Sequence, residues 1–355
     1  MTRSTLRLLL LADSHLGFDQ PRRPRVQQRR RGPDFFANFE RALRPALSGE
    51  VDLVVHGGDL LFRSKVPPSL VEQAIAPLRR VADAGVPVAL VPGNHERSQI
   101  PYGLLARHER LLLFDRPRAF VVEAGGLRVA LAGFPAVRDD VRHCFGQQLD
   151  ATGWREVDAD VRLLCLHQAI EGATVGPADF VFSSGDDVIR GRDLPREFAA
   201  VLAGHIHRQQ VLTHDLNGAP LPTPVFYPGS IERTSFAERD EDKGYLRIDV
   251  DVDRASGATA VSHRVCPLPA RPMVRVEIDV AGLDAVAVEM KIANAIAAAP
   301  VDAVVQLRAK NFGGDGTRVW PIAARLRALA PTTMTVEVVG MMQRFSGRQS
   351  SAGPR

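Results

Sequence analysis

The chain has 355 residues, of which 45% are hydrophobic and 24% are charged. These values are typical of a globular protein of about two domains, and they exclude a disordered or collagen-like chain. Lys and Arg total 45 against 41 for Asp and Glu, so the net charge of +4 permits an anionic partner without requiring one. The three cysteines lack CxxC spacing, which excludes a disulfide framework and indicates a reducing cytoplasm. The apolar runs near the N-terminus are far shorter than the ~20 residues of a membrane span, so we expect a cytoplasmic protein without a membrane segment.

Short apolar runs alternate with amphipathic stretches through the first two-thirds of the chain. The apolar runs predict buried strands, and the stretches between them predict helices because their hydrophobic residues recur at helical spacing. The predicted strands are 6–12, 51–56, 86–91, 161–166 and 199–203, and the predicted helices are 34–47, 68–84 and 102–113. This alternation predicts an α/β layered core.

After residue 205 the pattern changes to strands separated by turns. The strands predicted there, at 210–216, 225–227, 245–250 and 258–266, are expected to form a second sheet packed on the first. A proline cluster then marks a boundary, and beyond it alternating strands and helices predict a small α/β domain. We therefore expect domains at 1–268 and 269–340, followed by a polar tail, 341–355, that is expected to be disordered.

Five predicted strands end in residues that commonly bind metal ions. The segments are LLLADSH, VVHGGD, LVPGNHE, LLCLH and VLAGHIH, and their candidate ligands are Asp13, His15, Asp59, Asn94, His167, His205 and His207. Ligands gather at the carboxyl ends of strands in α/β sheets, so we expect these side chains to meet at one edge. Carboxylate, imidazole and amide groups suit Mn²⁺, Fe²⁺ or Zn²⁺, and the absence of cysteine among them argues against a structural zinc site.

The order of these motifs resembles that of the calcineurin-like metallophosphoesterases, whose core is a two-sheet α/β sandwich that holds two metals. A narrower resemblance, over about residues 5–266, is to the SbcD-type DNA repair exonucleases. The segments that carry it are DSHLGF, GDLL, PGNHER, LHQAIEG, GHIHRQQ and VFYPGSIERTSF, with KGY downstream. The resemblance implies a two-sheet metallophosphoesterase sandwich with a small α/β C-terminal cap domain that binds DNA.

The resemblance also implies roles for individual residues. One divalent ion would be held by Asp13, His15 and His207, and a second by Asn94, His167 and His205, with Asp59 bridging both. The expected ion is Mn²⁺, with Fe²⁺ or Zn²⁺ as alternatives. His95 matches the catalytic histidine, which would stabilise the charged transition state or protonate the leaving oxygen. His56 matches no ligand position, and we expect it to pack beside the ligands.

The activity implied by the resemblance is a two-metal-dependent DNA nuclease, a 3′–5′ exonuclease, an endonuclease or both, acting on DNA ends in double-strand-break repair. The implied partners are double-stranded DNA ends and an SbcC-type SMC-like ATPase, and a homodimer is a further option. Two alternatives remain open: a general phosphomonoesterase or cyclic-nucleotide phosphodiesterase, and a DNA-end-binding scaffold with weak catalysis. Many relatives have a polar residue where this chain has Phe62, which leaves the balance between exonuclease and endonuclease activity open.

A run of arginines follows the first ligand segment and is a candidate for contact with DNA phosphates. The candidate DNA-binding residues are Arg22, Arg23, Arg25, Arg29, Arg30 and Arg31, together with Arg97 and Arg233 within the motifs. A solvated charged face is the alternative interpretation of this run.

Overall fold

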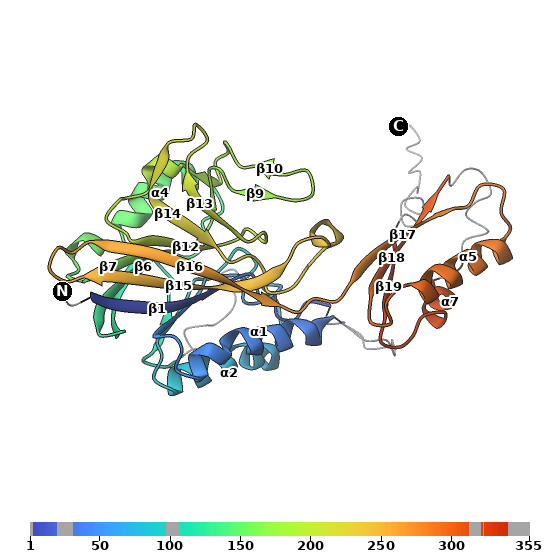
Figure 1. Ribbon diagram of the computed structural model, residues 1–355, viewed down its shortest axis with the longest axis horizontal. Coiled ribbons are helices and arrows are strands. Elements are labelled where there is room, and N and C mark those ends of the chain that lie inside the picture. The colour runs from blue at the N-terminus through green and yellow to red at the C-terminus, as the bar shows by residue number, and fades with distance from the viewer. Residues whose placement is uncertain (1–2, 20–30, 97–106, 312–320, 322, 340–355) are drawn as a thin grey trace, which may run out of the picture. The chain divides into compact units, whose positions relative to one another are not determined.

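The computed structural model describes residues 3–19, 31–96, 107–311, 321 and 323–339 (Figure 1). These residues form two compact units, one made mainly of residues 3–19 and 32–270 and one made mainly of the residues from Arg271 onward. The predicted tail 341–355 lies outside the described residues. Within the part of the chain that is described, no helix combines the length and the apolar character needed to cross a membrane.

The first sheet of the larger unit has six strands in the order β16-β15-β1-β2-β3-β4. Its bounds are β1 (Arg3–Leu11), β2 (Leu53–His56), β3 (Val88–Leu90), β4 (Leu111–Leu113), β15 (Lys243–Asp253) and β16 (Thr259–Leu268). Strands β1 to β4 run parallel, and β15 and β16 are antiparallel to their neighbours. Both faces of β1 are buried, because Leu9 and Leu11 pack with helices while Leu8 and Leu10 pack with residues of the other sheet. The near-continuous apolar run of this strand is thus explained by burial on two sides.

The helices packed in the cluster with Leu9 and Leu11 are α1 (Gly32–Leu47) and α2 (Pro68–Asp83). Phe35 and Phe39 of α1 are fully buried there, and α2 begins at a proline, which suits the first turn of a helix. Figure 1 shows the two helices lying together below β1, on one side of the sandwich.

The second sheet also has six strands, in the order β13-β14-β12-β7-β6-β5. Its bounds are β5 (Arg118–Ala124), β6 (Leu127–Gly133), β7 (Val161–His167), β12 (Ala200–Gly204), β13 (Gln210–His214) and β14 (Pro220–Tyr227). Shorter elements of this half are α4 (Val141–Asp150), η2 (Trp154–Glu156), β8 (Ala169–Ile170), β9 (Thr174–Val175), β10 (Phe180–Val181), β11 (Val188–Ile189), η3 (Gly191–Asp193) and η4 (Phe236–Glu238). Apolar side chains of both sheets share one buried cluster, so the predicted two-sheet α/β sandwich is confirmed.

Two local predictions were wrong. The strands after residue 205 do not form a separate sheet: β13 and β14 extend the sheet of β12, whereas β15 and β16 join that of β1. The predicted helix 102–113 is incorrect at its end, because 111–113 form strand β4 beside β3, and 102–106 lie outside the described residues. Strands β5 and β6 were not predicted. For β4 and β15 the decisive factor is pairing with a strand distant in sequence, which local spacing does not encode. Strands β5 and β6 instead pair with each other as a hairpin across Gly125 and Gly126.

The smaller unit is a three-stranded parallel sheet with helices between its strands. Its elements are β17 (Met273–Asp279), α5 (Ala285–Ala298), β18 (Val304–Lys310), α7 (Ala323–Ala328) and β19 (Thr335–Val339), with sheet order β17-β18-β19. Helix α5 is capped by Asp284, whose Oδ1 accepts from the Ala287 N–H at 2.8 Å. Val288, Ile292 and Ile296 of α5 lie on one face at helical spacing and are buried in the core of this unit.

Candidate metal centre

The candidate ligands follow strands of both sheets, in turns with an uncommon backbone conformation. Asp13, His15, Asp59 and His205 have φ angles of +50°, +43°, +53° and +87°. A non-glycine residue in the left-handed region costs free energy, so it persists only where its surroundings fix it. Here the turns fix each other, because Asp13 N donates to the Gly58 carbonyl and His15 N to the Asp59 carbonyl, both at 2.9 Å. These strained turns thus bring several polar side chains close together.

Glycines allow the ends of the two sheets to meet. A Cβ atom on Gly57 would lie 2.9 Å from the backbone nitrogen of Gly204, and one on Gly204 would lie 2.2 Å from the Gly57 carbonyl oxygen. Such distances exclude a side chain at either position. The glycines of the VVHGGD and VLAGHIH segments therefore bring the ligands of one sheet against those of the other, so the site lies between two sheet ends and not along one edge.

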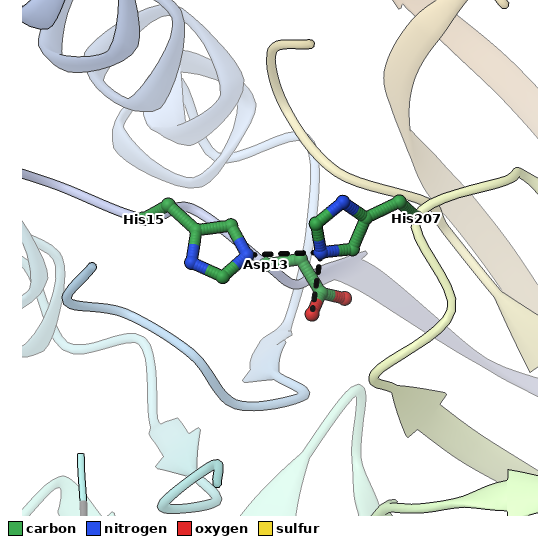
Figure 2. Close-up of side chains that lie close together, drawn as sticks. All are labelled: Asp13, His15 and His207. Atoms are coloured by element: carbon green, nitrogen blue, oxygen red, sulfur yellow. Dashed lines mark hydrogen bonds and ion pairs between the residues drawn. The ribbon is translucent and has the colours of Figure 1, made fainter. Parts of the chain in front are cut away.

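Asp13, His15 and His207 form the first half of the site (Figure 2). Nε2 of His15 and Nε2 of His207 face each other at 2.9 Å, and Nε2 of His207 lies 3.8 Å from Oδ1 of Asp13. Asp59 lies near the same ring, with Oδ2 4.0 Å from Nε2 of His15. Two imidazole nitrogens this close to two carboxylates suit a shared cation.

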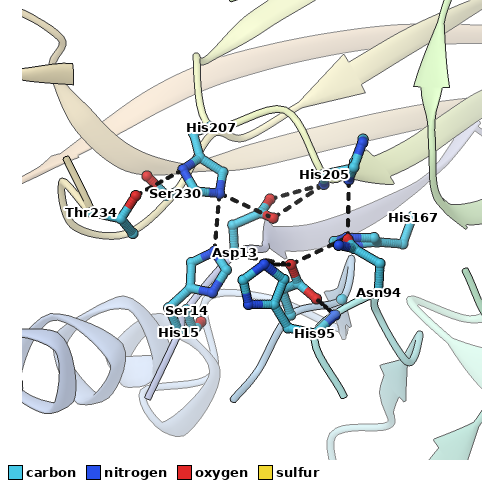
Figure 3. Close-up of polar contacts among 12 residues, drawn as sticks. Asp13, Ser14, His15, Asn94, His95, His167, His205, His207, Ser230 and Thr234 are labelled. Atoms are coloured by element: carbon cyan, nitrogen blue, oxygen red, sulfur yellow. Dashed lines mark hydrogen bonds and ion pairs between the residues drawn. The ribbon is translucent and has the colours of Figure 1, made fainter. Parts of the chain in front are cut away.

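Asn94, His167 and His205 form the second half (Figure 3). Oδ1 of Asn94 lies 2.9 Å from Nε2 of His167 and 3.2 Å from Nδ1 of His205. Oδ2 of Asp59 lies 3.5 Å from Nε2 of His167, while the same oxygen faces His15 of the first half. Asp59 is thus the carboxylate that both halves share.

The donor set fits two divalent cations. Ligands bound at about 2.0–2.2 Å from one ion lie roughly 3–3.5 Å from each other, which is close to most of these separations. The buried Nδ1 atom of His15 has no hydrogen-bond partner among the described residues, so no hydrogen bond there fixes the tautomer of this ring. Imidazole nitrogens, carboxylates and an amide oxygen suit Mn²⁺, Fe²⁺ or Zn²⁺.

Burial and mutual charge shift the pKa values of this cluster strongly. Burial and the neighbouring His207 hold the pKa of His15 well below its usual value, and burial lowers the pKa of His205 to about 3. Burial alone would also lower the pKa of His167, but the adjacent Asp59 carboxylate outweighs it and raises this pKa to about 9. His167 reciprocally keeps the pKa of Asp59 well below its ordinary value, despite burial. A bound cation would require neutral imidazoles, so metal binding should release protons from this cluster.

His95 lies beside the ligands and is held from two directions. Its backbone N–H donates to Oδ1 of Asp59 at 2.9 Å, and its Nδ1 donates to the Phe62 carbonyl at 2.8 Å. Nε2 remains 3.9 Å from Oδ2 of Asp59, and 38% of the side chain is exposed. Nε2 is therefore the nitrogen left to meet a substrate, although His15, Asp59 and His95 are also close enough to share an ion. The main chain of Phe62, not its side chain, makes the contact that orients His95.

Two buried residues, His56 and Glu96, support the segments that carry the ligands. The buried ring of His56 accepts from the Gly58 N–H at 3.2 Å and donates to Ser14 Oγ at 2.8 Å, so it joins the first two ligand segments. Sequence reasoning missed Glu96, which is fully buried and accepts from the N–H groups of Leu61 and Gly93 at 2.8 Å each. Its place as the last residue of the PGNHE motif was the available signal.

The structure describes only two of the eight candidate DNA-binding arginines. Six of them lie outside the described residues: Arg22, Arg23, Arg25, Arg29, Arg30 and Arg97. Arg31 is buried, with 4% of its surface exposed. Arg233 donates through Nε and Nη2 to the Glu241 carbonyl at 2.9 and 2.8 Å. Contact of these two guanidinium groups with DNA stays a prediction.

Residues 6–209 match the family model of the calcineurin-like phosphoesterases. The chain belongs to this family, a class of metal-dependent enzymes that hydrolyse phosphate esters, and the predicted resemblance is confirmed.

Within the class, the chain is similar to DNA double-strand break repair proteins named Mre11. It is 32% identical over 334 residues to the one from Haloferax volcanii, covering 94% of this chain and 67% of that protein. Identity is 30% to the proteins from Aeropyrum pernix and Halobacterium salinarum, covering 77% and 89% of this chain and 64% and 72% of theirs. The chain thus spans about two thirds of the length of these relatives. Among solved structures, a dimetal phosphatase from Danio rerio covers 70% of this chain and is itself covered to 95%, with 12% identity and a TM-score of 0.42.

Proposed function

We propose that this protein is a two-metal-dependent nuclease that hydrolyses phosphodiester bonds at DNA ends during double-strand-break repair. The observation that carries the proposal is the shared position of Asp59, whose Oδ2 faces His15 of one half-site and His167 of the other. A carboxylate placed between two sets of ligands suits a pair of metal ions about 3.5–4 Å apart. The similarity to the Mre11 proteins supports DNA as the substrate.

The proposed ligands are Asp13, His15 and His207 for one ion and Asn94, His167 and His205 for the other, with Asp59 for both. When bound, such a pair would polarise the phosphodiester and make a water molecule nucleophilic at neutral pH. Mn²⁺ is the proposed ion, as the resemblance implies, with Fe²⁺ or Zn²⁺ as alternatives, because the mixed set of imidazole, carboxylate and amide oxygen suits all three. The buried turns keep the ligands in place before substrate arrives, so the chain itself supplies the orientation.

His95 is the proposed catalytic histidine. Its Nδ1 donates to the Phe62 carbonyl, so Nε2 carries a second proton only in the positively charged form of the ring, and Nε2 is the nitrogen left to meet a substrate. From there it can donate to the charged phosphate oxygens or protonate the oxygen that leaves when the P–O bond breaks. The contact of its backbone N–H with Asp59 fixes this ring relative to both half-sites.

Double-stranded DNA ends in the cytoplasm are the proposed substrate. The SbcC-type ATPase and a homodimer stay predictions of the resemblance.

The DNA contacts of the arginine run are also predictions, and they can be tested by substituting Arg29 and Arg30. Arg29→Ala with Arg30→Ala should weaken duplex binding and reduce the slope of log K against log[salt] by roughly 0.9 per lost phosphate contact. An unchanged slope would identify the run as a solvated face.

The experiment that tests the function compares substrates under one condition. The full chain is incubated with Mn²⁺ and end-labelled duplex, single-stranded or hairpin DNA, and in parallel with a chromogenic phosphomonoester. Release of labelled nucleotides from duplex ends, lost in EDTA and restored by Mn²⁺, is the expected result. Hydrolysis of the monoester with intact DNA would favour a general phosphatase, and DNA binding without hydrolysis would favour a scaffold.

A further inference from the structure

The segment between β14 and β15 packs directly against the backbone of His207. Gly229, with φ +75°, lies so close that a Cβ atom there would be 2.8 Å from the His207 carbonyl oxygen and from the Gln209 nitrogen. The next residue, Ser230, donates its N–H to the same carbonyl at 3.1 Å. Figure 3 shows Thr234 on the side of His207 that faces away from Asp13. The YPGSIERTSF motif, which supplies none of the proposed ligands, therefore supports one of them.

Glu238, at the end of this motif region, contacts the imidazole of His207. Its Oε1 accepts from Nδ1 of His207 at 3.2 Å and from Oγ1 of Thr234 at 2.6 Å. The carboxyl side chain is only 10% exposed. Because Nδ1 carries the proton of this hydrogen bond, Nε2 is the nitrogen free to face Asp13 and His15.

Lys243 contacts both Glu238 and the main chain of His207. Its side chain is fully buried, and Nζ lies 2.7 Å from Oε2 of Glu238, 3.0 Å from Oε2 of Glu241 and 3.0 Å from the His207 carbonyl oxygen. The three acceptors match the three donors of an ammonium group. Lys243 thus holds His207 both through its main chain and through Glu238.

A buried ion pair of this kind rarely stabilises a fold more than apolar side chains of the same volume would. Here the ion pair serves to fix the orientation of the His207 ring. His15, the other histidine of the same half-site, has a buried Nδ1 atom without a partner among the described residues, so His207 is the ring of this half that a carboxylate orients.

We propose that Glu238 and Lys243 are positioning residues that hold Nε2 of His207 toward the first metal position. The proposal rests on the proposed function, since it takes His207 as a ligand. A carboxylate that accepts from the second nitrogen of a ligating histidine fixes both tautomer and ring orientation, and its removal lowers metal affinity about 10- to 100-fold. The KGY segment downstream of the motif thereby gains a role, because its lysine anchors the glutamate.

The test is calorimetric titration of the metal-free full chain with Mn²⁺. Glu238→Ala should weaken one of two binding steps about 10- to 100-fold and leave the other unchanged. Glu238→Gln can keep only one of the two contacts, because an amide oxygen that accepts from Nδ1 turns the amide nitrogen toward the Lys243 ammonium; it should therefore weaken the same step, but by less than Glu238→Ala. Glu238→Asp keeps a negative charge for Lys243 but falls short of the ring, so it should also weaken one step; it serves if the alanine variant folds poorly.

The matched control is Glu232→Gln, which alters a buried carboxylate of the same segment that contacts Asn38 and the N–H of Arg233. This control should leave both binding steps unchanged. Wild-type affinities in both Glu238→Ala and Glu238→Asp, or an equal loss in Glu232→Gln, would overturn the positioning role. A wild-type chain that binds no Mn²⁺ would instead overturn the proposed metal centre.

Discussion

The two halves of the candidate metal centre use the same kinds of ligand but are supported in different ways. His167 is held by main chain: its Nδ1 donates to the Gly57 carbonyl at 2.8 Å, and Gly58 packs against the ring. His207 is held by side chains from a separate segment, and 27% of its own side chain is exposed. His167 is thus fixed by the turns that end the strands, whereas His207 depends on a loop. Mutations should be able to damage one half without the other.

The largest effect is expected from removing the residue that both halves share. Asp59→Ala should abolish the binding of both ions and the activity, because the Asp59 carboxylate faces both His15 and His167. His205→Ala should remove one ion only. Metal analysis after dialysis checks this difference, and two ions at full occupancy in Asp59→Ala would contradict the bridging role.

The second-largest effect is expected at His95, and it should leave the metal ligands of both half-sites unchanged. His95→Asn should leave both ions bound and the fold intact while the hydrolysis rate falls by about 10²–10⁴-fold. Duplex binding should hardly change, since phosphate contacts elsewhere supply most of it. Metal content, DNA affinity and rate are measured on one batch. Loss of an ion would make His95 a ligand, and a wild-type rate would end its catalytic role.

A smaller and one-sided effect is expected from Gly58→Ala. The residue has φ +107°, and a Cβ atom there would lie 2.3 Å from Nδ1 of His167, so the ring must move. We expect weaker binding of one ion and a lower melting temperature. Gly126→Ala is the control, because its φ is also positive at +70° but the space around it is open. That control should show only the backbone cost of about 1–2 kcal/mol, with both ions retained. Equal behaviour of the two variants would mean that Gly58 does not support His167.

The same contrast explains what the sequence could predict. The ligand types, their order after apolar strands and the sandwich all follow from local patterns and motifs. The sheet to which β15 belongs does not, because Leu6 of β1 pairs with Val250, a contact across most of the chain. The support of His207 by Glu238 was likewise hidden, since a motif shows which residues recur but not which face one another. The arginine run was interpreted from charge alone, and charge does not reveal that Arg31 is buried.

The central claim is that two metal ions share Asp59 between the ends of the two sheets. Anomalous diffraction from crystals grown with Mn²⁺ tests it most directly. We expect two peaks about 3.5–4 Å apart, the usual separation in two-metal sites, with Asp59 between them. One peak should be ligated by Asp13, His15 and His207, and the other by Asn94, His167 and His205. A single peak, or an ion held by His95 in place of either set, would show that two ions do not share Asp59.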